Sequence, residues 1–174
     1  MMHDNEASGL IQIKPIVPQE YEATGEVVLK AYRHLLGDSL DEGYARYIGD
    51  VSARVDDSLV LVLKKNGKVL GTVTFVADPS SPMAEGLEDG EGAVRILAVD
   101  PAEQRSGYGR LLMAETIRLA KERHLDALFL HSTKEMVQAH NLYLSLGFLR
   151  VPKRDFRPIE TVSLLAFRLP LEKI

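Results

Sequence analysis

The spacing of apolar residues divides the first half of the chain into segments with strand and helix character. LIQIKPIV (residues 10–17) has strand composition, and the segment after Pro18 predicts a helix with one buried face. A second helical pattern covers roughly residues 39–54. The next run, SLVLVLKKNGKVLGTVTFV, contains two β-rich stretches joined at Asn66-Gly67, which predicts a hairpin with a tight turn.

The second half of the chain alternates strands with helices. Residues 77–92 predict an acidic, glycine-rich loop, and AVRILAV then predicts a strand that leads through a turn into a helix ending near Arg123. ALFLHS predicts a short buried strand, KEMVQAHNLYLSLG a helix, and FLRVP and TVSLLAFRLP the last two strands. The order β-α-α-β-β-β-α-β-α-β-β predicts one mixed α/β domain over residues 10–174, behind a loose tail of residues 1–9.

Composition narrows the classes of function. A net charge of -4 with a pI near 5.7 provides no basic field for nucleic acid. Because the chain has no cysteine, disulfides, thiolate metal sites and a cysteine nucleophile are excluded, and we expect no metal. No apolar run approaches the roughly 18 residues of a membrane span, and the N-terminal MMHDNEASGL is too polar for a secretory signal. We therefore expect a cytoplasmic protein with no membrane partner.

The turn between the AVRILAV strand and its helix has the composition of an anion-binding site. In VDPAEQRSGYGRLLMAETIRLA, Gly107 and Gly109 leave the backbone open where the first helix amides lack intrahelical partners. Arg105 and Arg110 add positive charge. The spacing alone is equally consistent with a tight packing turn, and neither a dinucleotide fingerprint nor a Walker pattern is present.

The same stretch resembles a known family motif. LAVDPAEQRSGYGRLLM is similar to motif A of the GNAT superfamily of N-acetyltransferases, which is Q/R-x-x-G-x-G/A after a V-x-P strand end. Gln104, Gly107 and Gly109 match the signature, and Val99 and Pro101 match its lead-in.

A second motif follows one strand later. AHNLYLSLGF resembles the family pattern A-x-x-L-Y-x-x-x-G-F, with Tyr143, Gly147 and Phe148 in place. Two motifs in the right order are far more specific than either alone. The resemblance implies a single GNAT-like domain of the mixed α/β class. Its central sheet is mixed, mostly antiparallel and splayed between the fourth and fifth strands, with helices on both faces.

The resemblance also implies acetyl-CoA as cosubstrate. The strand backbone at Leu97, Ala98 and Val99 would pair with the pantetheine arm, and an amide at Leu97 or Ala98 would polarise the thioester carbonyl. The pyrophosphate would lie on the turn, held by Gln104, Arg105, Ser106, Gly107, Tyr108, Gly109 and Arg110.

For the chemistry, Tyr143 matches the family tyrosine beside the CoA sulfur and is expected to donate to the leaving thiolate. Where the family often has a strand glutamate, this chain has Ala93. Glu91 is one candidate base, although Arg95 on the same strand face would neutralise it. His131 is another candidate, and a mechanism without a dedicated base remains open.

Two further features bear on ligands. The family commonly has an asparagine seven residues before the tyrosine, where this chain has Met136, so the pantetheine contact differs. Acidic residues in the 77–92 loop would suit a cationic amine, but a solvated loop without a role explains them equally well.

The leading hypothesis is an N-acetyltransferase that acts on a primary amine of a small molecule or peptide. The alternative is a non-catalytic acyl-CoA-binding module of the same fold. We expect a monomer or a homodimer, with any dimer contact away from the cofactor cleft.

Overall fold

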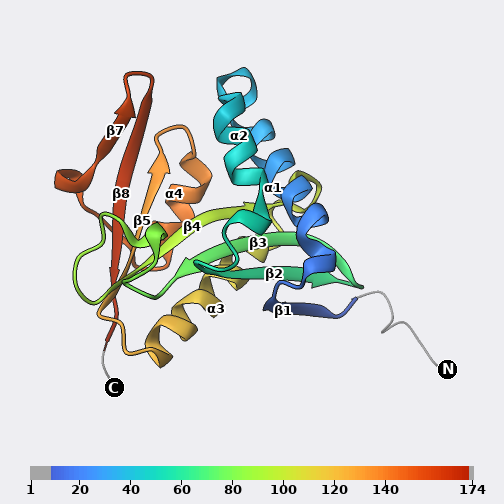
Figure 1. The fold of residues 1–174 in the computed structure, drawn as a ribbon, viewed down its shortest axis with the longest axis horizontal. Helices are drawn as coiled ribbons and strands as arrows, with labels where there is room; N and C mark the ends of the chain where they lie inside the picture. Colours follow the sequence, from blue (N-terminus) through green and yellow to red (C-terminus); the bar gives the residue numbers. More distant parts are fainter. Residues whose placement is uncertain (1–8, 173–174) are drawn as a thin grey trace.

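The computed structural model describes residues 9–172. They form an eight-stranded sheet in the order β1-β2-β3-β4-β5-β8-β6, with β7 also paired to β8 (Figure 1). The strands are β1 (Ile11–Pro15), β2 (Leu59–Lys65), β3 (Lys68–Val76), β4 (Glu91–Val99), β5 (Ala127–Thr133), β6 (Leu149–Arg150), β7 (Phe156–Ile159) and β8 (Val162–Pro170). The helices are α1 (Tyr21–Leu36), α2 (Glu42–Gly49), α3 (Tyr108–Glu122) and α4 (Val137–Ser145).

The sheet is antiparallel except where β4 pairs with β5. The β2–β3 hairpin turns at Asn66 and Gly67, whose φ angles of 53° and 80° give the left-handed pair that a tight hairpin turn requires. The expected class and architecture are therefore confirmed. Figure 1 shows α1 and α3 on opposite faces of the sheet.

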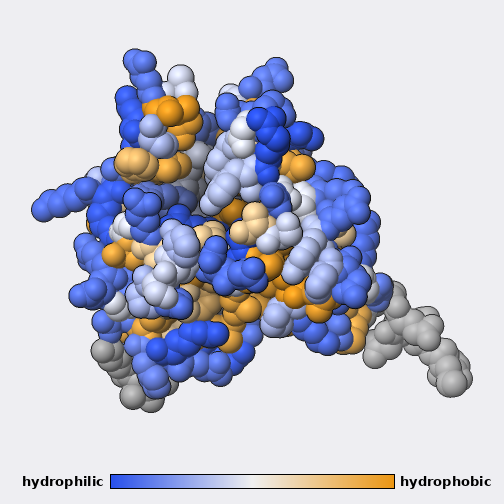
Figure 2. Space-filling model, viewed as in Figure 1, coloured by the Kyte–Doolittle hydropathy of each residue, from blue (hydrophilic) through white to orange (hydrophobic). Residues whose placement is uncertain are grey.

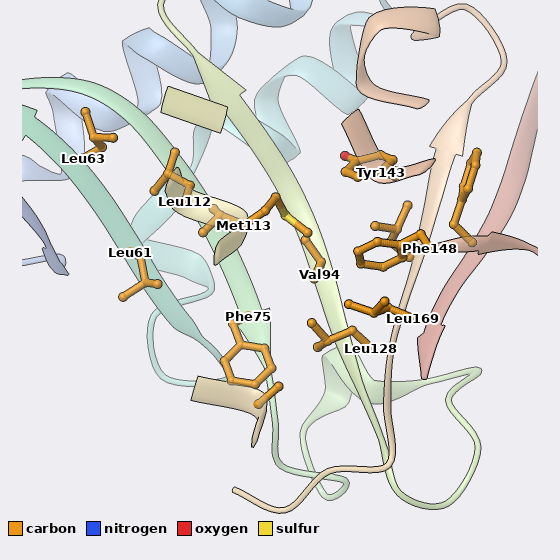
Figure 3. Packing of buried hydrophobic residues seen from close by; sticks show 14 of the residues in the cluster. Leu61, Leu63, Phe75, Val94, Leu112, Met113, Leu128, Tyr143, Phe148 and Leu169 are labelled. Carbon is orange, nitrogen blue, oxygen red and sulfur yellow. The ribbon is translucent and has the colours of Figure 1, made fainter. Parts of the chain in front are cut away.

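Alternating strand residues divide the core between the two faces. Leu61 and Leu63 of β2 join the larger cluster around Leu112 of α3, whereas Val62 between them packs with Val27 of α1. This period of two is what places apolar side chains on both sides of a buried strand. The larger cluster runs from β2 to β8 beneath α3 (Figure 3).

The two parallel strands separate soon after they meet. β4 pairs with β5 only from Glu91 to Ala93, opposite Ala127 to Phe129. Beyond this point β5 is paired on its other side with β8, and Figure 1 shows β4 and β5 diverging from their common end. The expected splay between the fourth and fifth strands is therefore present.

Some element boundaries differ from the sequence pattern. The second helix is shorter than expected, because α2 ends at Gly49 and a 3₁₀ turn (Val51–Ala53) follows. The β7 strand was not expected, since its four residues are all exposed and lack an alternating pattern. The helix expected from Lys134 begins at Val137, after a turn that includes Met136. Except for Gly9, the expected tail lies outside the described residues.

Candidate active site

The turn before α3 presents unpartnered backbone amides. Gly107 is the N-cap in a left-handed conformation (φ 81°, ψ 10°), and no side chain caps the helix. The first helical bond runs from the Leu111 amide to the Gly107 carbonyl at 3.0 Å, so the amides of residues 108–110 lack helical partners. Arg105, Ser106 and Gly107 are exposed. These features fit a large anion at the positive end of the helix.

The two glycines of the turn have different structural roles. A Cβ added at Gly107 would meet nothing within 4 Å, so its positive φ is what calls for glycine. At Gly109 a Cβ would face inward, 3.4 Å from Leu142 and 3.9 Å from Val99. Arg110 donates to the hydroxyl of Ser145 at 2.5 Å and ties the start of α3 to the end of α4.

The strand that leads into this turn carries a free edge. Beyond Ala93, β4 no longer pairs with β5, so its backbone groups on that side are available to an extended ligand. A bulge interrupts its other edge, because Thr72 pairs with Ala98 and Thr74 pairs with Arg95. β4 therefore has two residues, Ile96 and Leu97, where β3 has only Val73. Ile96 adopts a φ of 51° within this bulge.

A narrow slot of about 80 Å³ lies between the separating strands. Leu97 lines it from β4, Ser132 from β5, and Met136 and Tyr143 from the α4 segment. The slot therefore brings together the expected cofactor strand, the expected tyrosine and the methionine that stands in place of the family asparagine.

Tyr143 is buried at the edge of the main core. Its ring lies 5.6 Å from Phe148 and 5.8 Å from Phe167, and Figure 3 shows it beside Phe148. Burial raises the pKa of Tyr143 well above 10, so the hydroxyl keeps its proton throughout the neutral range. At neutral pH this hydroxyl can therefore donate a hydrogen bond but cannot act as a base.

Glu91 lies in a closed ion-pair cluster. Both Nη atoms of Arg154 donate to its carboxylate at 2.8 and 2.9 Å, and Arg168 Nε donates at 2.7 Å. The Glu88 amide adds a fourth bond at 2.9 Å, and the Glu91 side chain is 0% exposed. Burial alone would raise the pKa of Glu91, but these hydrogen bonds lower it overall. Arg95, the expected partner, instead donates to the Met83 carbonyl.

This geometry argues against Glu91 as a general base. Its carboxylate lacks both the access and the free lone pair that proton abstraction requires. The cluster joins the start of β4 to β8 and to the 3₁₀ turn Pro152–Arg154, at the closed end of the splay.

His131 lines both the slot and a larger cleft beside it. Its Nε2 lies 2.8 Å from the carbonyl oxygen of Arg154. Because a carbonyl oxygen only accepts, Nε2 carries the hydrogen, and the lone pair of the neutral ring is on Nδ1. The ring is fixed further by an edge contact with Phe129 at 4.9 Å.

The larger cleft has a volume of about 890 Å³. Tyr47 lines it from α2, Met83 from the loop before β4, and Phe156 and Leu164 from β7 and β8. In Figure 2 the α2 projection and the β7–β8 projection stand apart, with a hollow between them. The cleft and the slot share Arg95, His131 and Leu164, so these three residues form the junction between the two spaces.

Several site residues were not found from the sequence. Arg54 lines the cleft yet is only 5% exposed, and Tyr44 lines the slot. Ser132 lines the slot with its hydroxyl 3.1 Å from His140 Nε2, and burial lowers the pKa of His140 so that its ring is neutral near pH 7. Each of these residues lies in a stretch with the pattern of an ordinary helix, turn or strand, so no local spacing identifies it as a site residue.

Residues 9–172 contain neither a metal-binding cluster nor a membrane-spanning helix. No group of three or more His, Asp or Glu side chains there is arranged to hold a metal ion. No helix in that range is long and apolar enough to cross a membrane.

Comparison with known proteins places this chain in a family. Mycothiol acetyltransferase of Cellulomonas flavigena is 30% identical over 96 residues, which are 55% of this chain and 28% of that protein. The chain thus spans less than a third of that relative. A GNAT acetyltransferase from Staphylococcus aureus Mu50 has a TM-score of 0.75 at 16% identity, covering 94% of this chain and 100% of that one.

A second solved structure carries the cofactor. YncA from Salmonella typhimurium, determined with its cofactor acetyl-CoA, has a TM-score of 0.65 at 21% identity over 95% of this chain and 96% of that one. The family model for the Acetyltransferase (GNAT) family matches residues 29–148, more than half of the chain. The protein is therefore a member of the GNAT acetyltransferase family.

Proposed function

We propose that this protein uses acetyl-CoA as its cosubstrate and acts on nitrogen, moving the acetyl group to a primary amine of a small molecule or peptide by direct attack on the thioester. The observation that carries this proposal is the junction of slot and cleft at Arg95, His131 and Leu164. A thioester in the slot and an amine in the cleft would meet there without a covalent enzyme intermediate. Holding both reactants in contact supplies much of the rate acceleration.

The binding residues follow the course of the free β4 edge. The backbone of Leu97 to Val99 would pair with the pantetheine arm, which leaves the sheet where the chain enters the turn. The unpartnered amides of residues 107–110 would hold the pyrophosphate, with Arg105 and Arg110 beside them. The Leu97 amide in the bulge would donate to the thioester oxygen as negative charge develops on it.

Tyr143 would stabilise the leaving thiolate. Its pKa, raised by burial, exceeds the value of about 8.5 that is typical of a thiol. Complete proton transfer from Tyr143 to sulfur is therefore uphill, and its main contribution is a hydrogen bond to the thiolate as the C–S bond breaks.

His131 is the better placed of the two candidate bases. Its Nδ1 lone pair is free when the ring is neutral, whereas the Glu91 carboxylate is fully bonded. An amine arriving as an ammonium ion would lose one proton to Nδ1 before attack, and bulk solvent would take that proton from the open cleft.

The test is acetyl-CoA turnover with matched nucleophiles. Thiol release is measured with amines, alcohols and non-CoA thiols of similar carbon skeleton, and each product is assigned by mass spectrometry. We expect amide products from amines and no ester or thioester products. Acetylation of oxygen or sulfur only would refute the proposal, as would CoA binding without turnover of any acceptor.

A further inference from the structure

Three arginines line the large cleft, but only one is paired with carboxylates. Arg154 is held by Glu91 and by Glu88. Among residues 9–172, neither Arg54 nor Arg95 has a carboxylate oxygen within 4.0 Å. Two positive charges in one cleft therefore have no acidic side chain paired with them.

Arg54 is a buried cation with unused donors. Its Nη1 donates to the carbonyl oxygens of Ile48 at 2.8 Å and Asp50 at 3.3 Å, which fixes the guanidinium. Its Nε and Nη2 are buried and have no hydrogen-bond partner among the described protein atoms. Burial lowers the pKa of Arg54, yet an arginine stays charged at any pH of interest. An unpaired buried charge is costly, and a nearby anion reduces that cost.

Arg95 lies at the junction between cleft and slot. Its Nε and Nη2 both donate to the Met83 carbonyl, at 3.2 and 2.9 Å, which leaves Nη1 unused. Burial raises the pKa of Tyr44, while Arg95 and Arg54 both act to lower it. The two guanidinium groups thus act on the same part of the site, beside Tyr44.

We propose that the part of the cleft lined by Arg54 and Arg95 binds a carboxylate of the acceptor, and that the acceptor is a free α-amino acid. Arg95 makes the direct contact, and the buried Arg54, which lines the same cleft, adds positive potential through protein that screens charge less than water does. Because Arg95 borders the slot itself, the carboxylate and the reacting amine must be only a few bonds apart. This inference rests on the proposed N-acetyltransferase function.

The remaining charges of the cleft fit a zwitterion. Asp155 is bonded to Arg150 and to the Ala166 amide, so it is already satisfied. Asp50 also lines the cleft, accepts a hydrogen bond from Ser52 and favours the charged form of Arg54 without forming an ion pair with it. Asp57 and Glu85 line the cleft as well and would attract an ammonium group. A peptide N-terminus has an amide where the amino acid has its carboxylate, so it would leave Arg95 without an anion.

The first test compares α-amino acids with their carboxamides. The twenty common amino acids and the matching amino-acid amides are offered with acetyl-CoA, and kcat/KM is measured for each pair. For the best substrate we expect the acid to exceed its amide by about 10- to 100-fold, the range for a hydrogen bond to a charged group. Equal rates, or faster amides, would overturn the proposal.

Substitutions at the two arginines test whether they cause the preference for the acid over its amide. In Arg95→Gln the advantage of the acid over the amide should fall towards one, while the glutamine can still donate to the Met83 carbonyl. Arg118→Gln removes an arginine from the exposed face of α3 and should keep the full advantage. Arg54→Gln should reduce it less than Arg95→Gln does. Should Arg54→Gln fail to fold, Arg95→Gln alone decides, and an undiminished advantage there would refute the proposal.

A binding measurement separates this inference from the proposed function. Calorimetry with N-acetyl amino acids and N-acetyl amino-acid amides, in the presence of CoA, needs no turnover. Tighter binding of the acids that is lost in Arg95→Gln supports the carboxylate site even when no amine is acetylated. Amine acetylation without any such difference retains the function and refutes the site. Aminophosphonates form a third arm, and their preference over carboxylates would refute the assignment to amino acids.

Discussion

The proposed cofactor-binding half and the proposed acceptor-binding half of the site offer their ligands different chemical groups. On the cofactor side, the free edge of β4 and the amides before α3 offer backbone groups from one continuous stretch of about residues 94–110. On the acceptor side, the cleft is lined by side chains from α2, the loop before β4, β5 and the β7–β8 hairpin. Backbone recognition needs glycines at fixed spacing, whereas side-chain recognition needs residues that only the fold brings together.

The cofactor half is tested most strongly by Tyr143→Phe, which keeps the buried ring and deletes the hydroxyl. We expect kcat to fall by about 10²- to 10⁴-fold, the range for lost general-acid help. We expect the lower end of that range, because the raised pKa of Tyr143 makes complete proton transfer to the thiolate unfavourable. CoA affinity and thermal stability should change little, because the ring still packs on Phe148 and Phe167.

The matched control is Tyr21→Phe, at the start of α1 and outside the slot. It should retain the wild-type rate. A Tyr143→Phe enzyme that turns over a confirmed substrate at the wild-type rate, with chemistry rate-limiting, would rule out the donor role.

The same contrast explains how far the sequence could predict the protein. The motif around Gln104, Gly107 and Gly109 is local, so it indicated the turn directly, and the family resemblance that it carries implied the splayed sheet. Glu91 looked like a candidate base because strand spacing gives its face but not its neighbours. Its partners Arg154 and Arg168 lie 63 and 77 residues away in sequence. Arg54 gave no signal, since it is held by the backbone carbonyls of Ile48 and Asp50, and a backbone partner leaves no mark in the sequence.

Glu91→Gln tests the buried ion-pair cluster of Glu91 with Arg154 and Arg168, which lies at the closed end of the splay. The substitution leaves Arg154 and Arg168 without their buried counter-charge, and removing one partner of a buried ion pair costs about 3–5 kcal/mol. Because both arginines are partly exposed, we expect about 3 kcal/mol of lost unfolding free energy in urea denaturation. Glu115→Gln, in an exposed pair on α3, should cost less than about 1 kcal/mol. Similar costs for the two variants would show that the Glu91 cluster stabilises the fold no more than an exposed ion pair does.

The pH dependence of stability gives a second measure of Glu91. Its pKa is lower in the folded protein than the value of about 4.3 for an unfolded glutamate, so the ion pair contributes fully above that pH. As the pH falls below about 4.3, wild-type stability should decrease as the carboxylate protonates. The Glu91→Gln protein should lose less stability over the same interval. Parallel curves of stability against pH for the two proteins would show that the Glu91 carboxylate does not contribute to the pH dependence of stability.

The two glycines of the turn should respond differently to alanine. Gly107→Ala forces a side chain into the left-handed region at a cost of about 1–2 kcal/mol, and should weaken CoA binding by shifting the turn. Gly109→Ala places its methyl group in ordinary contact with Leu142 and adds a better helix former, so stability should hold or rise. Denaturation and calorimetry measure both effects. Weaker CoA binding in a stable Gly109→Ala protein would mean that this methyl group faces the phosphate.

The smallest effect is expected from Glu85→Gln, in the acidic loop that borders the acceptor cleft. Glu85 is exposed and has no ion pair among residues 9–172, so its attraction for an ammonium group acts through water. Exposed charges interact by less than about 1 kcal/mol, which limits the rise in KM to about five-fold. At 0.5 M salt the Debye length falls to roughly 4 Å, and the difference from wild type should disappear. A ten-fold rise in KM that persists at high salt would mean that Glu85 contacts the amine directly, and the acceptor would then be recognised by its positive charge more than by an anion at Arg95.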